Sequence, residues 1–142
     1  MLDAPIARVE NLRVEFQTKQ GLVVGVEDVS FEINSGETVC VVGESGSGKS
    51  VSSLSLMRLV EFGGGKIVDG RLLFDRKAKG FIDLVQTDQA LMQSIRGNEI
   101  GMIFQEPMTA LNPVFTVERQ LTEGLRLHRT LGSDQATKRA LE

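Results

Sequence analysis

Residues 43–50 read Gly-Glu-Ser-Gly-Ser-Gly-Lys-Ser, and this stretch decides the fold. It matches the pattern G-x-x-x-x-G-K-[ST] at every fixed position. The apolar run at residues 38–42 precedes it and is typical of a strand that is buried on both faces. Residues 49–62 follow it and carry apolar side chains at helical spacing. A strand, a glycine-rich loop and a helix in this order predict an α/β fold built around a phosphate-binding loop.

Each part of residues 43–50, which we call the cradle, has its own task in binding a triphosphate. The glycines let successive backbone N–H groups turn inward around an anion, and the helix N-terminus adds a favourable dipole. Lys49 is expected to reach the β- and γ-phosphates, and the Ser50 hydroxyl to bind a bridging Mg²⁺. ATP with Mg²⁺ is the expected ligand, and the alternative is a glycine-rich turn with an incidental Lys-Ser pair. The expected contacts are Gly43, Glu44, Ser45, Gly46, Ser47, Gly48, Lys49 and Ser50.

The chain on either side of the cradle mixes strands and helices. Residues 7–16 and 22–33 alternate apolar and polar side chains, which predicts an antiparallel pair of strands. Downstream, the pattern predicts strands at 67–75, 81–85 and 100–104, and helices at 88–95, from Thr116 and from Ser133. Two prolines predict irregular backbone over residues 106–115. No repeat or domain boundary is evident, so one compact unit is expected.

The composition excludes several classes of protein. With 142 residues, 41% hydrophobic and 25% charged, the chain can bury one core and is not typical of disorder. The net charge is −3 without a basic block, so nucleic acid is not an expected partner. No secretory signal or membrane-span pattern stands out, and a soluble, cytoplasmic chain is expected. Cys40 is expected to be buried in its apolar run, and His128 to be a solvated surface residue.

Two segments together resemble one family. Residues 42–51, which contain the cradle, and the segment Ile103-Phe104-Gln105-Glu106-Pro107-Met108-Thr109-Ala110-Leu111-Asn112-Pro113-Val114-Phe115-Thr116-Val117 are similar to ATP-binding-cassette (ABC) proteins of the dipeptide, oligopeptide and glutathione importers. Residues 56–60 and 96–128 look most like the N-terminal cassette of the glutathione importers. The resemblance covers nearly the whole chain and is weakest between Lys66 and Gln93.

The resemblance implies roles for further residues. It implies a P-loop NTPase fold of the ABC type, with residues 1–142 as part of one nucleotide-binding domain that ends before the signature and Walker B motifs. Gln105 matches the position where the family's Q-loop begins, which implies contact with Mg²⁺ and the attacking water. Phe16 lies where the family stacks an aromatic ring on adenine, although a plain core phenylalanine is the alternative. Glu106 is not expected to be the family's catalytic glutamate.

The resemblance also implies a function and partners. The complete protein would be an ATPase that drives peptide or glutathione uptake, with permease subunits, a second nucleotide-binding domain and, indirectly, a substrate-binding protein. It would lie on the cytoplasmic face of the inner membrane, and residues 1–142 alone would be inactive in hydrolysis. One alternative is a truncated, stand-alone nucleotide-binding module. Another is a different P-loop enzyme such as a small-molecule kinase, whose arginine-rich lid is not visible in the sequence.

Overall fold

A computed structural model describes residues 5–76, 80–105, 111–129 and 131–142. The chain divides into two compact units, Met1–Met92 and Gln93–Glu142. The sequence alone showed no such boundary, because both units carry the same mixture of apolar and polar segments. Each unit is described by itself below.

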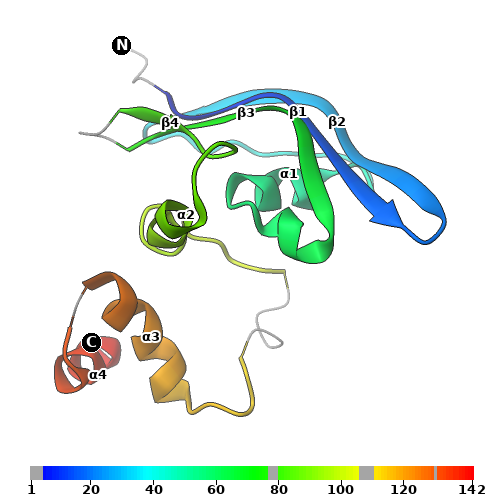
Figure 1. The fold of residues 1–142 in the computed structure, drawn as a ribbon. Coiled ribbons are helices and arrows are strands. Elements are labelled where there is room, and N and C mark those ends of the chain that lie inside the picture. Colours follow the sequence, from blue (N-terminus) through cyan, green and yellow to red (C-terminus); the bar gives the residue numbers. More distant parts are fainter. Residues whose placement is uncertain (1–4, 77–79, 106–110, 130) are drawn as a thin grey trace. The chain divides into compact units, whose positions relative to one another are not determined.

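The first unit is built on an antiparallel sheet (Figure 1). Strand β1 (Pro5–Thr18) pairs with β2 (Gly21–Asn34) on one side and with β3 (Gly65–Asp75) on the other. The short strand β4 (Phe81–Asp83) pairs with β3, so the order is β2-β1-β3-β4. The predicted antiparallel pair at 7–16 and 22–33 is confirmed, and so is the strand at 67–75.

One face of β1 forms the core of this unit. Its inward side chains alternate along the strand, as a pleated backbone requires. A register irregularity between Val9 and Leu12 shifts the alternation by one residue, and Asn11 there has a φ of 49°. The buried side chains of this row are Ala7, Val9, Leu12 and Val14.

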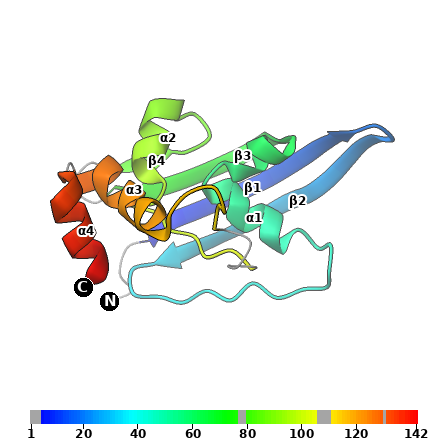
Figure 2. The ribbon, with the colours of Figure 1, turned by 90° about the horizontal axis from the view of Figure 1, so that it is seen from below.

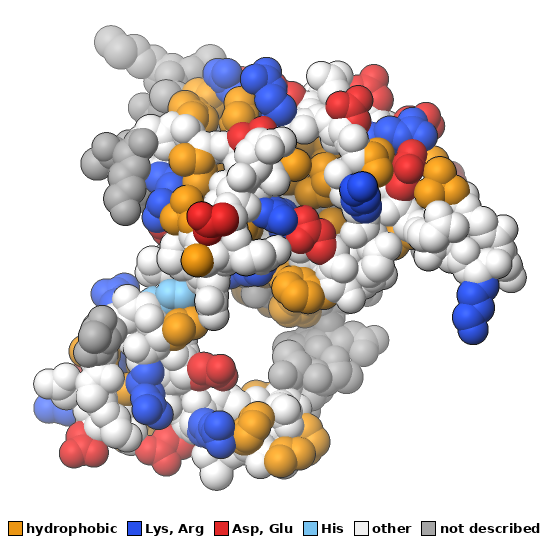
Figure 3. Space-filling model, viewed as in Figure 1, with side chains coloured by type: hydrophobic (Ala, Val, Ile, Leu, Met, Phe, Trp, Pro, Cys, Tyr) orange, Lys and Arg blue, Asp and Glu red, His pale blue; other side chains and the backbone are white. Residues whose placement is uncertain are grey.

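The other face of the sheet is charged. Arg8 pairs with Glu32, and Arg71 pairs with Glu10, in both cases across neighbouring strands. Arg13 bonds Glu15 and Glu27, and these two hydrogen bonds raise the pKa of its guanidinium above the ordinary value. Figure 3 shows blue and red side chains side by side over β1 and β2. This face is suited to water rather than to a core.

Helix α1 (Lys49–Leu56) lies against the sheet, as the two views in Figures 1 and 2 agree. It is shorter than the helix predicted over 49–62. The reason is Arg58, whose φ of 51° is left-handed and interrupts the helical backbone. The chain continues as a 3₁₀ helix, η1 (Leu59–Gly63), in which Val60 is buried as the helical spacing predicted.

Two predicted strands are wrong. Residues 38–42 run beside β2 without joining the sheet (Figure 2), and residues 100–104 form only an isolated bridge between Ile100 and Arg96. A strand needs a neighbour for its backbone N–H and C=O groups, and no neighbouring strand meets either run within the described residues. Cys40 is consequently exposed, which corrects the prediction of a buried thiol.

The second unit contains two helices that pack against each other. Helix α2 (Gln89–Ile95), within which the first unit ends, is followed by α3 (Val117–Arg129) and α4 (Ser133–Leu141). Thr116 caps α3 as predicted, because its Oγ1 accepts a hydrogen bond from Arg119 N at 3.2 Å. A bond of 2.8 Å from Thr137 Oγ1 to the Glu118 carboxylate joins α4 to α3. In the described part of the chain, no helix has the length and apolar content to cross a membrane.

Candidate nucleotide-binding site

The cradle forms an open loop that leads into α1. Residues 43–47 are exposed, and a turn is closed by a hydrogen bond of 3.2 Å from Ser47 N to Glu44 O. Gly48 is the N-cap of α1, and the first helical hydrogen bond runs from Ser52 N to Gly48 O at 2.8 Å. No side chain caps this helix end. No capping side chain accepts a hydrogen bond from the N–H groups of the first turn, so these groups can donate to a bound anion.

Gly48 can only be a glycine in this arrangement. Its φ of 90° is left-handed, which glycine adopts at the least cost. A Cβ there would lie 2.6 Å from the carbonyl oxygen of Gly25 and 3.0 Å from Val26 Cγ2. The start of α1 is thus pressed against the backbone of β2, and the sheet holds the cradle in place.

Lys49 bends back across the cradle. Its Nζ donates hydrogen bonds to Gly43 O at 2.8 Å and to Glu44 O at 2.5 Å, and it lies 3.4 Å from Ser47 Oγ. The positive charge is therefore held at the loop and not in bulk solvent. Ser50 is exposed at the second residue of α1. An ammonium, a hydroxyl and uncapped amides together form the donor set that a phosphate chain with a divalent cation needs.

Phe16 lies at the end of the inward-facing row of β1. Val14, two residues earlier, is fully buried, whereas Phe16 is half-buried. Its ring lies against Gly25 of β2 and Gly65 of β3, since a Cβ at either glycine would fall within 2.7 Å of a ring carbon. Gly25 in turn touches Gly48, so the structure connects Phe16 to the cradle through one residue of β2.

A cavity of about 410 Å³ opens beside α1. Lys49 and Ser50 are among its lining residues, and most of the remaining lining is apolar. The lining residues are Phe31, Ile33, Val39, Val41, Lys49, Ser50, Ser52, Ser53 and Leu56. Sequence reasoning did not find this cavity, because its lining combines residues of β2, of the run 38–42 and of α1, which only the fold brings together.

A family model described as ABC transporter matches residues 26–142. The chain belongs to the ABC transporter family. This match confirms the family predicted from the cradle and from the segment that follows Gln105.

Relatives of this ABC transporter chain are named for import. An ATP-binding protein of Brucella abortus (strain 2308) named for peptide import is 49% identical over 138 residues, 97% of this chain and 41% of that protein. The glutathione import ATP-binding protein GsiA of Escherichia coli (strain K12) is 45% identical over 131 residues, 92% of this chain and 21% of that protein. The chain therefore spans less than half the length of either relative.

Solved structures agree on the fold. A dimeric structure of MJ0796, a bacterial ABC transporter cassette, matches with a TM-score of 0.76 at 24% identity, over 95% of this chain and 54% of that one. A second structure of the same cassette, described as a post-hydrolysis state bound to ADP and Pi, matches with a TM-score of 0.73 at 23% identity. The predicted α/β fold of ABC type is thereby confirmed.

Gln105 of this ABC transporter chain lies in the second unit, whereas the cradle lies in the first. It is exposed at the end of an irregular segment. Residues 106–110 of the family-like segment, including Glu106, lie outside the described residues. His128 is half-buried in α3, with its Nε2 3.4 Å from where a Cβ on Gly97 would be, so it is less solvated than expected.

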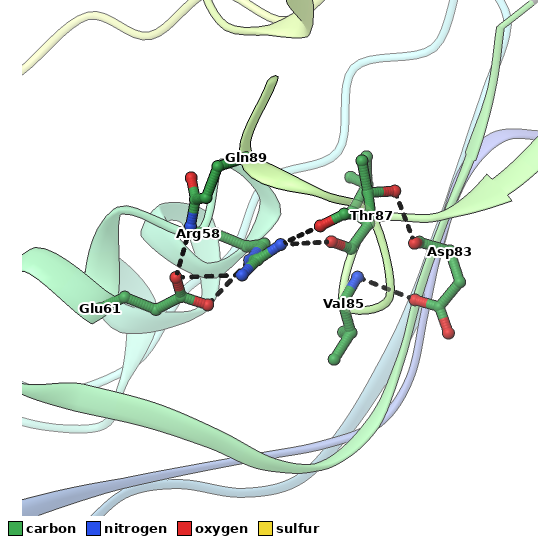
Figure 4. Close-up of polar contacts among 7 residues, drawn as sticks. Arg58, Glu61, Asp83, Val85, Thr87 and Gln89 are labelled. Carbon is green, nitrogen blue, oxygen red and sulfur yellow. Dashed lines mark hydrogen bonds and ion pairs between the residues drawn. The ribbon is translucent and has the colours of Figure 1, made fainter. Parts of the chain in front are cut away.

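Sequence reasoning also missed an arginine that joins two segments of the first unit (Figure 4). Arg58 donates to the carboxylate of Glu61 at 2.7 Å, and to the carbonyl oxygens of Thr87 at 2.5 Å and Leu84 at 3.4 Å. Gln89 reaches the same carboxylate at 3.5 Å. Because Arg58 is 26 or more residues from its carbonyl partners, no local pattern predicts these contacts.

Proposed function

We propose that this chain forms the nucleotide-binding part of the ATPase subunit of an ABC importer, and that the complete protein couples ATP hydrolysis to uptake of a small peptide. Glutathione, a dipeptide or an oligopeptide is the proposed substrate class. The observation that carries the proposal is the cradle, in which Lys49 is held over Gly43 and Glu44 at an uncapped helix start. The import names of relatives at 45–49% identity support the substrate class.

ATP and Mg²⁺ would occupy the cradle. The backbone N–H groups of residues 43–50 would hold the phosphate chain, and Lys49 would exchange its carbonyl partners for the β- and γ-phosphates. The Ser50 hydroxyl would hold Mg²⁺, which would neutralise charge on the phosphates when bound. Gln105 is proposed, from its match to the start of the family's Q-loop, to contact the metal and the attacking water. Phe16 would stack on the adenine ring with the face that is not packed on the glycines.

Residues 1–142 form part of a nucleotide-binding domain in this proposal. The chain matches 54% of a solved cassette, and its apolar runs at 38–42 and 100–104 have no strand partner among the described residues. A signature motif and a Walker B strand would be supplied by a further part of that domain. The competing view, a stand-alone nucleotide-binding module without hydrolysis, is distinguished by the mass of the native protein, which should be several times 15.5 kDa.

The proposed partners follow from the importer role. They are membrane permease subunits, a second nucleotide-binding domain and, indirectly, a substrate-binding protein, with the ATPase peripheral on the cytoplasmic face of the inner membrane. A related cassette that was solved as a dimer supports the second domain. The charged outer face of the sheet, with its cross-strand ion pairs, gives no support for a nucleic-acid partner.

Uptake into reconstituted vesicles tests the function. The full-length protein and its permease would be assembled in liposomes with ATP on the side of the ATPase. The substrate-binding protein would be added on the other side together with labelled glutathione or a labelled dipeptide. ATP-dependent accumulation of either is expected, and Lys49→Ala should abolish it while Lys19→Ala, in the exposed hairpin turn, should not. Hydrolysis without accumulation of any peptide would contradict the importer role.

The role of Gln105 is tested separately. Gln105→Ala should lower transport-coupled hydrolysis far more than ATP affinity, because the proposed contacts are to the metal and the attacking water and not to the base or phosphate chain. An equal loss of binding and hydrolysis would argue against this role.

A further inference from the structure

The Phe16 ring sits in a slot made by two glycines on the strands that flank β1. A Cβ at Gly25 of β2 would lie 2.6 Å from Phe16 Cε2 and 3.1 Å from Cδ2. A Cβ at Gly65 of β3 would lie 2.7 Å from Cε1 and 2.9 Å from Cζ. These separations are shorter than carbon atoms tolerate, so any larger residue at either position would displace the ring. The height of the ring above the sheet is therefore set by the two glycines.

Gly25 also touches the start of α1. Its carbonyl oxygen would be 2.6 Å from a Cβ on Gly48, and its own Cβ position is 3.6 Å from Val51 Cγ1. One residue of β2 is thus in contact with the aromatic ring on one side and with the end of the cradle on the other. Phe16 remains half-buried, so part of the ring is available to a ligand.

We propose that Gly25 is a positioning residue that fixes the Phe16 ring beside the cradle, so that ring and cradle together bind a nucleoside triphosphate, the ring taking the base. This inference rests on the proposed function, in which the ligand is a nucleotide and Phe16 stacks on its base. Gly25 itself does not touch the ligand; it acts through the position of Phe16. Gly65 supports the same ring from β3.

A ligand without a base distinguishes the contribution of the Phe16 ring to binding from that of the cradle. Inorganic tripolyphosphate offers a phosphate chain to the cradle but no base to Phe16. Affinities for ATP and tripolyphosphate, both with Mg²⁺, would be measured by calorimetry on the full-length protein and on Phe16→Ala, Gly25→Ala and the double variant. Gly63→Ala is the matched control, because a Cβ there meets nothing within 4 Å and its φ is not left-handed.

Phe16→Ala and Gly25→Ala should each weaken ATP binding by roughly 5- to 100-fold, the range expected when one base–aromatic stack is lost. Tripolyphosphate affinity should stay within about twofold, a free-energy change of well under 1 kcal/mol. In the Phe16→Ala background, Gly25→Ala should add nothing, since the ring it displaces is gone. If Gly25→Ala instead weakens both ligands alike, or keeps its full effect without the ring, the proposal is overturned.

A folding defect would not hide the result. Phe16→Leu with Gly25→Ala relieves the collision, and this pair should be as stable as Phe16→Leu alone and show the same ratio of ATP to tripolyphosphate affinity. A ratio that is unchanged from the wild type in every Phe16 variant would mean that the ring is only a core residue, and would overturn the inference while leaving the cradle intact. Failure of the wild-type protein to bind either ligand would instead overturn the proposed function.

Discussion

Strand β1 and the run at residues 38–42 both carry apolar side chains that predict a strand, but only the side chains of β1 are buried. In β1, Val9, Leu12 and Val14 expose 1% or less of their surface. In the run, Val39, Val41 and Val42 expose 37%, 52% and 84%. β1 has β2 on one side and β3 on the other, whereas residues 38–42 pair with no strand in the described ranges. The difference shows that an apolar run is buried only where neighbouring strands satisfy its backbone.

The largest expected effect comes from the buried strand. Leu12→Ala should lower the free energy of unfolding by about 2–5 kcal/mol, because it removes a fully buried side chain and leaves a cavity. Chemical denaturation of residues 1–142 measures this change. Val42→Ala, at a side chain that is 84% exposed, is the matched control and should stay within about 0.5 kcal/mol. Similar losses at both positions would contradict the contrast between the two regions.

A smaller effect is expected where the cradle meets the sheet. Gly48→Ala should lower the free energy of unfolding by about 1–3 kcal/mol. The substitution strains a left-handed backbone position, and its Cβ would collide with the Gly25 carbonyl oxygen. Gly46→Ala separates these causes, since Gly46 has a φ of 82° but its Cβ would meet nothing within 4 Å. In thermal unfolding, Gly48→Ala should therefore have a lower Tm than Gly46→Ala. Equal stability would mean that the helix start does not press on β2.

The smallest effect concerns the thiol in the exposed run. Cys40 of the 142-residue chain should react with a thiol reagent at a rate within roughly threefold of the same chain unfolded in guanidinium chloride, because its side chain is not covered. The rate of this reaction is measured from the absorbance of the coloured product that the thiol reagent releases. In the full-length protein, protection of Cys40 would indicate that residues 38–42 gain strand neighbours there. Strong protection already in the 142-residue chain would mean that the run is buried.

Much of the fold could be predicted because its signals are local. The alternation in 7–16 indicates which side chains of β1 are buried, the polar turn between 7–16 and 22–33 predicts that the two strands pair, and the cap at Thr116 marks the start of a helix. The cradle is a contiguous motif, and its residue types predict which of them bind phosphate and which binds Mg²⁺. These eight contiguous residues predict the loop and the helix that follows, whereas the contact of Gly48 with Gly25 of β2 has no signal in the motif itself.

The rest depended on partners far away in the chain. Residues 38–42 and 100–104 carry a strand pattern, but a pattern cannot supply the neighbouring strand. The glycine slot under Phe16 arises because β1 lies between β2 and β3, which brings Gly25 and Gly65 beneath one ring. The left-handed backbone of Arg58, which ends α1 early, accompanies its hydrogen bonds to Leu84 and Thr87. None of these features has a short-range signature.

Binding of a triphosphate by the cradle can be measured with the full-length protein. Calorimetric titration of Mg-ATP into the full-length protein should show binding that Lys49→Ala weakens by at least about tenfold, which is the loss of about 1.4 kcal/mol expected for charge-assisted hydrogen bonds to phosphate. Lys19→Ala should leave the affinity unchanged. Equal ATP affinity in the wild type and in Lys49→Ala would show that Lys49 of the cradle does not contact the triphosphate.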